Sequence, residues 1–402
     1  MSDKGCAVVL NLSAFAWMCV PPYSVLYVPI VNIFFYLLPL CIPLLNKKKI
    51  CIGNFREALL YFLVWGGIYA ISFVFNSHMP ETSYLLYTLY GTVFLLMSDS
   101  VKRLTFNIFV KVYAVILSLG IIEYVLFLQG LYIPIGITTR ENAAANYDLI
   151  QCLFSFISLY SDDYVRFQSL ANEPGLIGTL CALLLFVMDR KEHKIAFFVF
   201  VIAGILTLSL AFYILFLLYI LFQMRSKRNV LVAVACLVIL YMAYNIFKDT
   251  ASVELVTERI ESGQDADNRT SDQFEQHLNQ MMSSSRIWFG MGYGAIEDLY
   301  ISDGGNSGAK VCFYHIGILG IILLFVMYTY LILKKKGVNY ISFCFLVAFW
   351  MSFYQRDTIS VPYNVIVFFS PLMANMIEKT KLKRRIAYEN ITNHTTVRAG
   401  RS

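Results

Sequence analysis

Residues 195–222 read IAFFVFVIAGILTLSLAFYILFLLYILF, a run of 28 residues without a charge. A helix that crosses the roughly 30 Å hydrocarbon core of a bilayer needs about 20 apolar residues. The run is therefore too long for one span and too short for two full ones. Basic residues flank it on both sides, at 190–191 and 225–228. Because basic loops collect on the cytoplasmic side, we predict two short helices that break near 207–209 and return to that side.

The composition of the whole chain is that of a membrane protein. Of its 402 residues, 58% are hydrophobic and 14% are charged, and the mean hydropathy is +0.63. A soluble domain carries about 25% charged residues, so soluble enzymes and disordered chains are excluded. The net charge of +6 does not indicate nucleic-acid binding, because most basic residues lie in short connections between apolar runs. The nine cysteines form no CxxC pair, so no zinc site is expected.

The predicted fold class is all-α, a polytopic bundle of about twelve transmembrane helices. In lipid, only helices and closed barrels satisfy every backbone polar group, and the apolar runs here far exceed the strands of a barrel. The predicted spans are 6–21, 24–45, 58–75, 83–97, 106–128, 174–188, 195–207, 208–223, 229–247, 311–333, 339–354 and 359–377.

Charge divides the connections into two sets. Basic connections follow every second span, which predicts a cytoplasmic location for them and for both termini. The other side carries two large loops. In the first, Leu149–Tyr160 is weakly amphipathic and is a candidate for lying along the membrane surface. The predicted organisation is 1–128, N-terminal spans; 129–173, first external loop; 174–247, central spans; 248–310, second external loop; 311–378, C-terminal spans; 379–402, basic tail.

Arginine dominates the few basic residues on the external side, whereas lysine dominates the cytoplasmic connections. A guanidinium is always charged and presents a planar fork that matches carboxylate or phosphate oxygens. One interpretation is that these arginines pair with neighbouring carboxylates. Arg259, which lies between Glu258 and Glu261, fits this interpretation well. The other is that they bind an anionic substrate. The six arginines are Arg140, Arg166, Arg259, Arg269, Arg286 and Arg356.

Glu173 precedes Pro174-Gly175, a pair that suits the first turn of the next span. Two interpretations stay open for this carboxylate. It is a helix cap that the helix dipole favours, or it is a base at the external membrane face, within reach of an arginine.

The second loop contains Arg286 and then Gly290, Gly292 and Gly294, which would allow a backbone to approach a ligand closely. No βαβ pattern surrounds these glycines, so a dinucleotide site is rejected. His315 lies near the external end of the following span. It is either a packed, hydrogen-bonded residue or a functional group, since ionisable residues within spans are functional candidates.

Several short motifs resemble the O-antigen polymerase and O-antigen ligase superfamily of bacterial polytopic membrane glycosyltransferases. They are Arg166 ahead of Glu173-Pro174-Gly175, the break at 207–211, the glycines at 290–294, and the stretch Tyr314–Gly320. Family ligases carry a His-Asn pair where this chain has Gly305-Asn306. The missing histidine favours a polymerase.

The resemblance implies metal-independent glycosyl transfer, without a cofactor, at the outer face of the bacterial inner membrane. The donor would be a glycan on polyprenyl pyrophosphate, and the acceptor a hydroxyl at the non-reducing end of a second lipid-linked repeat unit. The glycan would be O-antigen, capsule or exopolysaccharide. Partners are the bilayer and the lipid-linked oligosaccharide, and a chain-length regulator protein is a further candidate. Alternatives are an O-antigen ligase and a lipid-linked oligosaccharide flippase or transporter.

The resemblance also assigns roles to individual residues. Arg166 and Arg286 are expected to converge on the leaving pyrophosphate, and Glu173 or His315 to accept the acceptor's proton. Replacing either arginine by alanine is expected to abolish long chains without loss of protein. The remaining candidates for binding substrate are Arg140, Arg259, Arg269, Gly290, Gly292, Gly294, Asn306 and Arg356.

Overall fold

A computed structural model describes residues 2–18, 29–45, 54–76, 82–140, 147–160, 165–171, 173–223, 271–293, 295, 308–356 and 358–371. Helices account for 77% of the residues it describes, so the mainly helical prediction is confirmed. Three described helices are long and apolar enough to cross a membrane, α4 (Phe55–Asn76), α6 (Asp99–Leu128) and α13 (Gly308–Lys336). Twelve spans are not confirmed, because six other apolar stretches of helix are shorter and the predicted span 229–247 lies outside the described residues.

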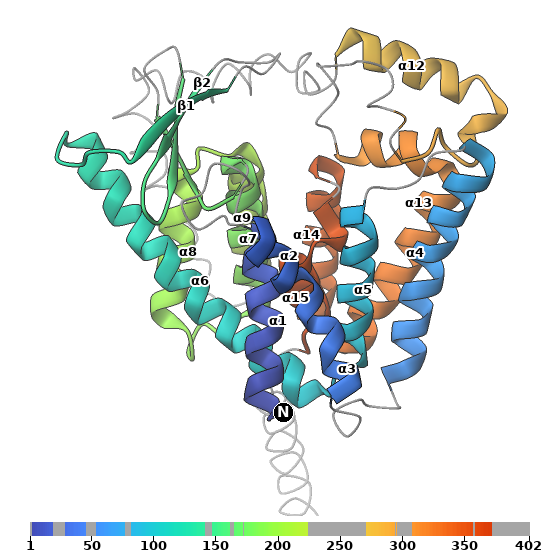
Figure 1. The fold of residues 1–402 in the computed structure, drawn as a ribbon, viewed down its shortest axis with the longest axis horizontal. Helices are drawn as coiled ribbons and strands as arrows, with labels where there is room; N and C mark the ends of the chain where they lie inside the picture. The colour runs from blue at the N-terminus through green and yellow to red at the C-terminus, as the bar shows by residue number, and fades with distance from the viewer. Residues whose placement is uncertain are drawn as a thin grey trace, which may run out of the picture.

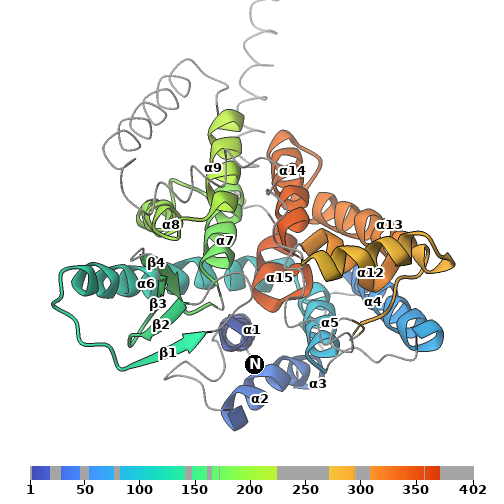
Figure 2. The same cartoon turned by 90° about the horizontal axis from the view of Figure 1, so that it is seen from above.

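The helices form a bundle with the chain's N-terminal helix near its middle (Figure 1). All eight residues of α15 are buried, as are nearly all residues of α7. Seen from above, α1 and α15 lie in the middle of the ring of helices (Figure 2). The other elements are α1 (Asp3–Met18), α2 (Pro29–Leu37), η1 (Leu38–Leu40), α3 (Cys41–Leu45), α5 (Thr82–Leu96), α7 (Pro174–Val187), α8 (Lys194–Leu206), α9 (Leu210–Gln223), α12 (Asp272–Met282), η4 (Ser285–Ile287), α14 (Tyr340–Gln355), η6 (Thr358–Ser360) and α15 (Pro362–Phe369).

Side chains cap the start of several helices. The Ser98 hydroxyl accepts from the amide of Val101 at the start of α6, at 3.5 Å. The Asn339 side chain accepts from the amide of Ser342 at the start of α14, at 3.0 Å. Each cap satisfies one of the amides that a helix leaves without an internal partner. The polar residues before the apolar runs therefore set where these helices begin.

The predicted hairpin in residues 195–222 is present. Helix α8 ends at Leu206 and α9 begins at Leu210, and Leu208 between them has a left-handed φ of 49°. The rings of Phe197, early in α8, and Tyr219, late in α9, lie 6.1 Å apart. The two helices are therefore antiparallel, and the start of α8 and the end of α9 lie at the same end of the molecule.

Basic residues from distant connections gather at that end, which we call the basic end. Lys102 of α6 and Lys335 of α13 are close enough to interact electrostatically. Lys335 donates to Asn54 at 2.8 Å, and Lys336 donates to the carbonyl of Val367 at 2.9 Å. The Tyr340 hydroxyl, at the start of α14, donates to the Phe222 carbonyl near the end of α9. Within the described residues, the basic positions near 102 and 335, which the sequence assigns to one side of the membrane, thus lie at one end of the fold.

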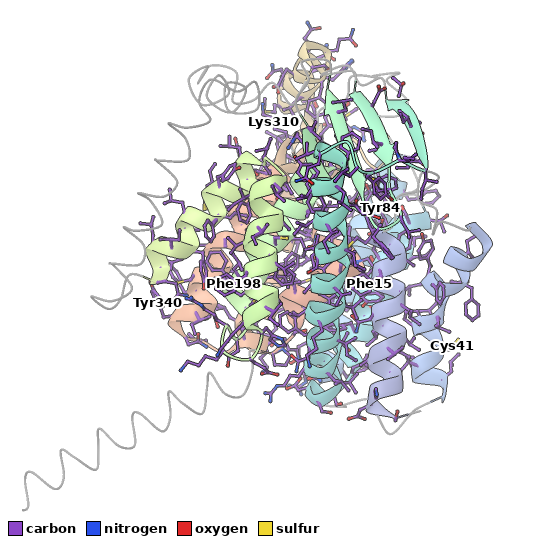
Figure 3. The ribbon with its side chains drawn as sticks, turned by 90° about the vertical axis from the view of Figure 1, so that its left-hand side faces the viewer. Phe15, Cys41, Tyr84, Phe198, Lys310 and Tyr340 are labelled. Carbon is purple, nitrogen blue, oxygen red and sulfur yellow. The ribbon has the colours of Figure 1, made fainter. Side chains whose placement is uncertain are left out.

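A four-stranded antiparallel sheet lies at the opposite end, which we call the sheet end (Figure 1). Its strands follow one another in sequence as β1 (Gly136–Arg140), β2 (Tyr147–Gln151), β3 (Phe156–Tyr160) and β4 (Val165–Ser169). The all-α prediction is therefore wrong for this loop. Leu149–Tyr160 is not one amphipathic surface segment, because it turns between β2 and β3. Figure 3 shows Lys310, the third residue of α13, at this same end.

Glu123 of α6 holds the sheet on the bundle. Its carboxylate is buried and accepts from the Ser155 hydroxyl at 2.7 Å, the Phe154 amide at 3.0 Å and the Tyr132 hydroxyl at 3.3 Å. A buried charge is tolerated only when hydrogen bonds replace its water. These donors lie in the turn between β2 and β3 and in the segment before β1, so one carboxylate fixes both to α6.

The hairpin break packs closely on α7 at Gly178. A Cβ at this position would lie 2.8 Å from the Thr207 hydroxyl oxygen and 2.9 Å from the Ser209 Cβ. We therefore expect Gly178→Ala to destabilise the detergent-solubilised protein by about 1–3 kcal/mol, because the break must move. The control is Gly66→Ala in α4, where nothing lies within 4 Å of an added Cβ and a gain of up to about 1 kcal/mol is expected. Equal thermal stability of the two variants would contradict the close packing.

Candidate functional site

An ion pair stands at the start of α7, at the sheet end. Arg356 Nη1 lies 2.6 Å from Glu173 Oε2, and the side chains are 18% and 44% exposed, respectively. Arg356 follows the last residue of α14, and Glu173 directly precedes α7. The pairing joins two residues 183 positions apart in sequence, and no sequence pattern indicated it.

Gly175 allows the guanidinium to sit against the first turn of α7. A Cβ at Gly175 would overlap Nη2 of Arg356. Glu173 has the extended backbone of a capping residue, but its side chain makes no capping hydrogen bond. The predicted N-cap position of Glu173 is therefore confirmed, and its carboxylate pairs with Arg356 instead of an amide of the helix. The N-terminus of α7, with its partial positive charge, therefore lies beside the guanidinium of Arg356.

One donor of Arg356 is left over. Within the described part of the chain, its Nε is buried and has no hydrogen-bond partner. Buried donors without a partner are uncommon in proteins and require an explanation. Tyr363 of α15 is near enough to interact electrostatically with both Arg356 and Glu173. Arg356, the start of α7 and Ser209 from the hairpin break, which also lies beside Gly175, form what we call the α7 site.

Arg166 lies at the hairpin break that borders the α7 site. Arg166 as a whole is 9% exposed, and its guanidinium donates to the Thr207 carbonyl at 2.9 Å and to the Leu208 carbonyl at 3.4 Å. These carbonyls lie at the end of α8, where the helix supplies no further amides. Arg166 therefore caps α8 and ties β4 to the hairpin. The expectation that it can be removed without loss of protein is revised accordingly.

Arg286 lies on a different side of the bundle. Its Nη1 donates to the Phe75 carbonyl at 2.7 Å, near the end of α4. Figure 2 shows β4 and the group formed by α4, α12 and α13 on opposite sides of α15. The predicted convergence of Arg166 and Arg286 is therefore wrong, because each guanidinium caps the carbonyl end of a different helix.

The glycines of the second loop lie against a helix. Gly290 has a φ of 74°, and a Cβ there would overlap the His315 carbonyl. Gly317 breaks the regular backbone of α13, and a Cβ added there would overlap the Gly290 amide nitrogen. The Gly292 amide donates to the His315 carbonyl at 3.0 Å. The glycines were predicted to let the backbone approach a ligand. In the structure Gly290 and Gly292 instead let the loop backbone pack against α13.

His315 is buried beside Tyr293, with their ring centroids 5.0 Å apart. Neither ring nitrogen has a hydrogen-bond partner among the described residues. His315 is remote from Glu173 in the fold, since α13 and α7 are separated by α14 and α15 (Figure 2). The two candidate bases therefore belong to different places, and only Glu173 stands beside a guanidinium.

For the other predicted residues the structure describes no side-chain contacts. Arg140 is described only as the last residue of β1. No group of three or more His, Cys, Asp or Glu side chains that could hold a metal occurs among the described residues. Four candidates lie outside those residues, Arg259, Arg269, Gly294 and Asn306.

No family model matches this chain, and no curated protein matches it. The resemblance carried by the short motifs therefore remains a hypothesis.

Removing the Arg166 cap tests its role in the fold. We expect Arg166→Met to lower the stability of the detergent-solubilised protein by about 1–3 kcal/mol, because buried carbonyls lose their donor. Arg286→Met removes a cap made by an exposed side chain and should stay within about 0.5 kcal/mol of the parent. Thermal unfolding of the two variants side by side gives the comparison. Equal losses would mean that burial of Arg166 is not what stabilises the hairpin.

Proposed function

We propose that this chain is a metal-independent membrane glycosyltransferase that polymerises polysaccharide repeat units. It would transfer a glycan from polyprenyl pyrophosphate to the non-reducing end of another lipid-linked unit. The observation that carries the proposal is the α7 site, where Arg356 and a helix N-terminus meet beside a carboxylate at the sheet end. In the proposal the sheet end faces the outside of the bacterial inner membrane, and the basic end faces the cytoplasm.

The α7 site suits a pyrophosphate. Helix N-termini attract anions through their partial positive charge and their amides, and a guanidinium adds a fork of donors that matches phosphate oxygens. The buried Nε of Arg356 is a further donor, because it makes no hydrogen bond to the described residues. As the bond between the sugar carbon and the pyrophosphate oxygen breaks, negative charge grows on that oxygen. Fixed positive groups aimed at this charge lower the barrier.

Glu173 supplies the proton acceptor. When a pyrophosphate takes over the guanidinium of Arg356, the carboxylate loses its ion-pair partner and becomes a stronger base. The attacking hydroxyl oxygen forms the new bond to the sugar carbon, its proton passes to Glu173, and polyprenyl pyrophosphate leaves with the electron pair of the broken bond. Donor binding would thus switch on the base, which limits reaction with water before the donor is in place.

Arg166 acts in this proposal as a positioning residue. By capping α8 it holds the break at 207–209, and Ser209 of that break lies beside Gly175. Arg286, on the far side of α15, has no contact with this chemistry in the proposal. The assignment thus moves from two converging arginines to a single arginine at a helix terminus.

Variants of the ion pair test the proposal in cells. In a deletion strain complemented with Arg356→Lys or Glu173→Gln, we expect polysaccharide polymerisation to fall about 100-fold or more, since each loses a group that acts on the transition state. Arg190→Lys, an exposed arginine at the basic end, is the matched control and should polymerise normally. Protein abundance is measured in parallel. Normal chain length in both site variants would overturn the proposed role of the α7 site.

The glycans of the deletion strain separate the three candidate functions. Loss of a polymerase leaves single repeat units attached at the cell surface. Loss of a flippase leaves none outside, and loss of a ligase leaves polymer on the carrier lipid. Either of the last two outcomes would contradict a polymerase.

A further inference from the structure

Four apolar side chains between α6 and the sheet point away from the protein. Leu131 is 69% exposed, Ile133 is 89%, Ile135 is 54% and Ile137 is 62%. They occupy every second position, so they share one face of an extended segment that runs into β1. We call these four residues the apolar row. Figure 2 shows this segment at the periphery of the bundle, outside α6.

The intervening residues face inward and are less exposed. The Tyr132 hydroxyl donates to Glu123, and the Thr138 hydroxyl accepts from Gln151 at 3.0 Å. An antiparallel sheet with one face in water places its apolar residues toward the core and its polar residues outward. In this segment the order is reversed, which indicates that the outward face does not meet water.

The apolar row continues the exposed face of α6. Val115 is 60% exposed, Ile122 is 55%, Val125 is 43% and Leu128 is 55%, and their spacing puts them on one side of the helix. This helix is one of the three that are long and apolar enough to cross a membrane. An exposed apolar stripe on such a helix faces lipid, so the surface that precedes the apolar row is already a lipid-facing one.

Distance along α6 places the apolar row near the membrane surface. Lys111 is exposed on the same face, and a lysine on a span reaches for the headgroups. Leu128 is 17 positions further on, about 26 Å at about 1.5 Å per residue. The hydrocarbon core is about 30 Å thick, so the exposed apolar face of α6 from Lys111 to Leu128 has nearly the length of the core. The residues that follow therefore enter the boundary between acyl chains and headgroups.

We propose that the apolar row inserts into the leaflet at the sheet end and anchors the sheet to the membrane surface. The sheet carries Arg166 on β4, which holds the hairpin break beside the α7 site. The anchor thereby sets the height of that site relative to the headgroups. The proposal does not depend on glycosyl transfer, because it rests only on exposure, alternation and continuity with α6.

Cysteine labelling in lipid vesicles tests the anchor. We compare Ile133→Cys with the control Thr139→Cys, which is exposed on the same face two positions beyond the apolar row. A charged maleimide that does not cross membranes is applied in vesicles and again in detergent without lipid, and the labelling of the parent protein is subtracted. We expect labelling at position 133 to be lost in vesicles and restored in detergent, while position 139 is labelled in both.

A second measurement identifies what covers the row. An environment-sensitive fluorophore on Ile133→Cys should be quenched by lipids that carry nitroxides on their acyl chains, and not by aqueous iodide. Labelling in vesicles as fast as at position 139, with quenching by iodide, would overturn the proposal in favour of a water-facing row. Protection without nitroxide quenching, together with disulfide-linked dimers, would overturn it in favour of contact with a second copy. Position 133 is a surface position, so the substitution should leave the fold intact.

Discussion

The buried guanidinium of Arg166 resolves the main structural difficulty of this chain. A helix that ends among apolar neighbours leaves its last carbonyls without donors, and each one costs free energy when water is excluded. Helix α8 ends in this way, because 28 uncharged residues must turn back on themselves. Arg166 reaches from β4 and donates to the carbonyls of Thr207 and Leu208. The sheet and the hairpin therefore depend on each other, and the first turn of α7 packs against the break that they stabilise.

Two further contacts attach the parts between helices to the bundle. Glu123 accepts hydrogen bonds from the turn between β2 and β3, and Gly290 and Gly317 let the second loop and α13 meet backbone to backbone. In both cases the polar groups of an irregular segment find partners on a helix, as buried backbone requires. At the sheet end the first turn of α7 is buried, and the Glu173 side chain that precedes it is 44% exposed. Arg356 is held there at 2.6 Å.

The candidate site was only partly predictable. Arg356 and Glu173 could each be selected, because a guanidinium and a carboxylate near the ends of apolar runs require an explanation. Their pairing could not, since nothing in the residues around 173 or 356 points to a partner 183 positions away. Arg166 and Arg286 were both predicted to bind the leaving pyrophosphate, but in the structure both donate to helix carbonyls. The same chemistry that lets a guanidinium bind phosphate lets it bind carbonyl oxygens, and only the surroundings choose between them.

The sequence by itself determined the helical, membrane type of the fold and the position of the hairpin break. Both follow from local constraints, the length of an apolar run and the charges at its ends, which act wherever the run is placed. The tertiary structure alone decided that the loop after α6 forms a sheet, that Arg356 reaches Gly175, and that Arg166 and Arg286 lie apart. The strands of that loop are only five residues each, and their stability comes from pairing with one another and from the carboxylate of Glu123. Such pairings depend on which distant surfaces meet, and no local pattern of residues records that.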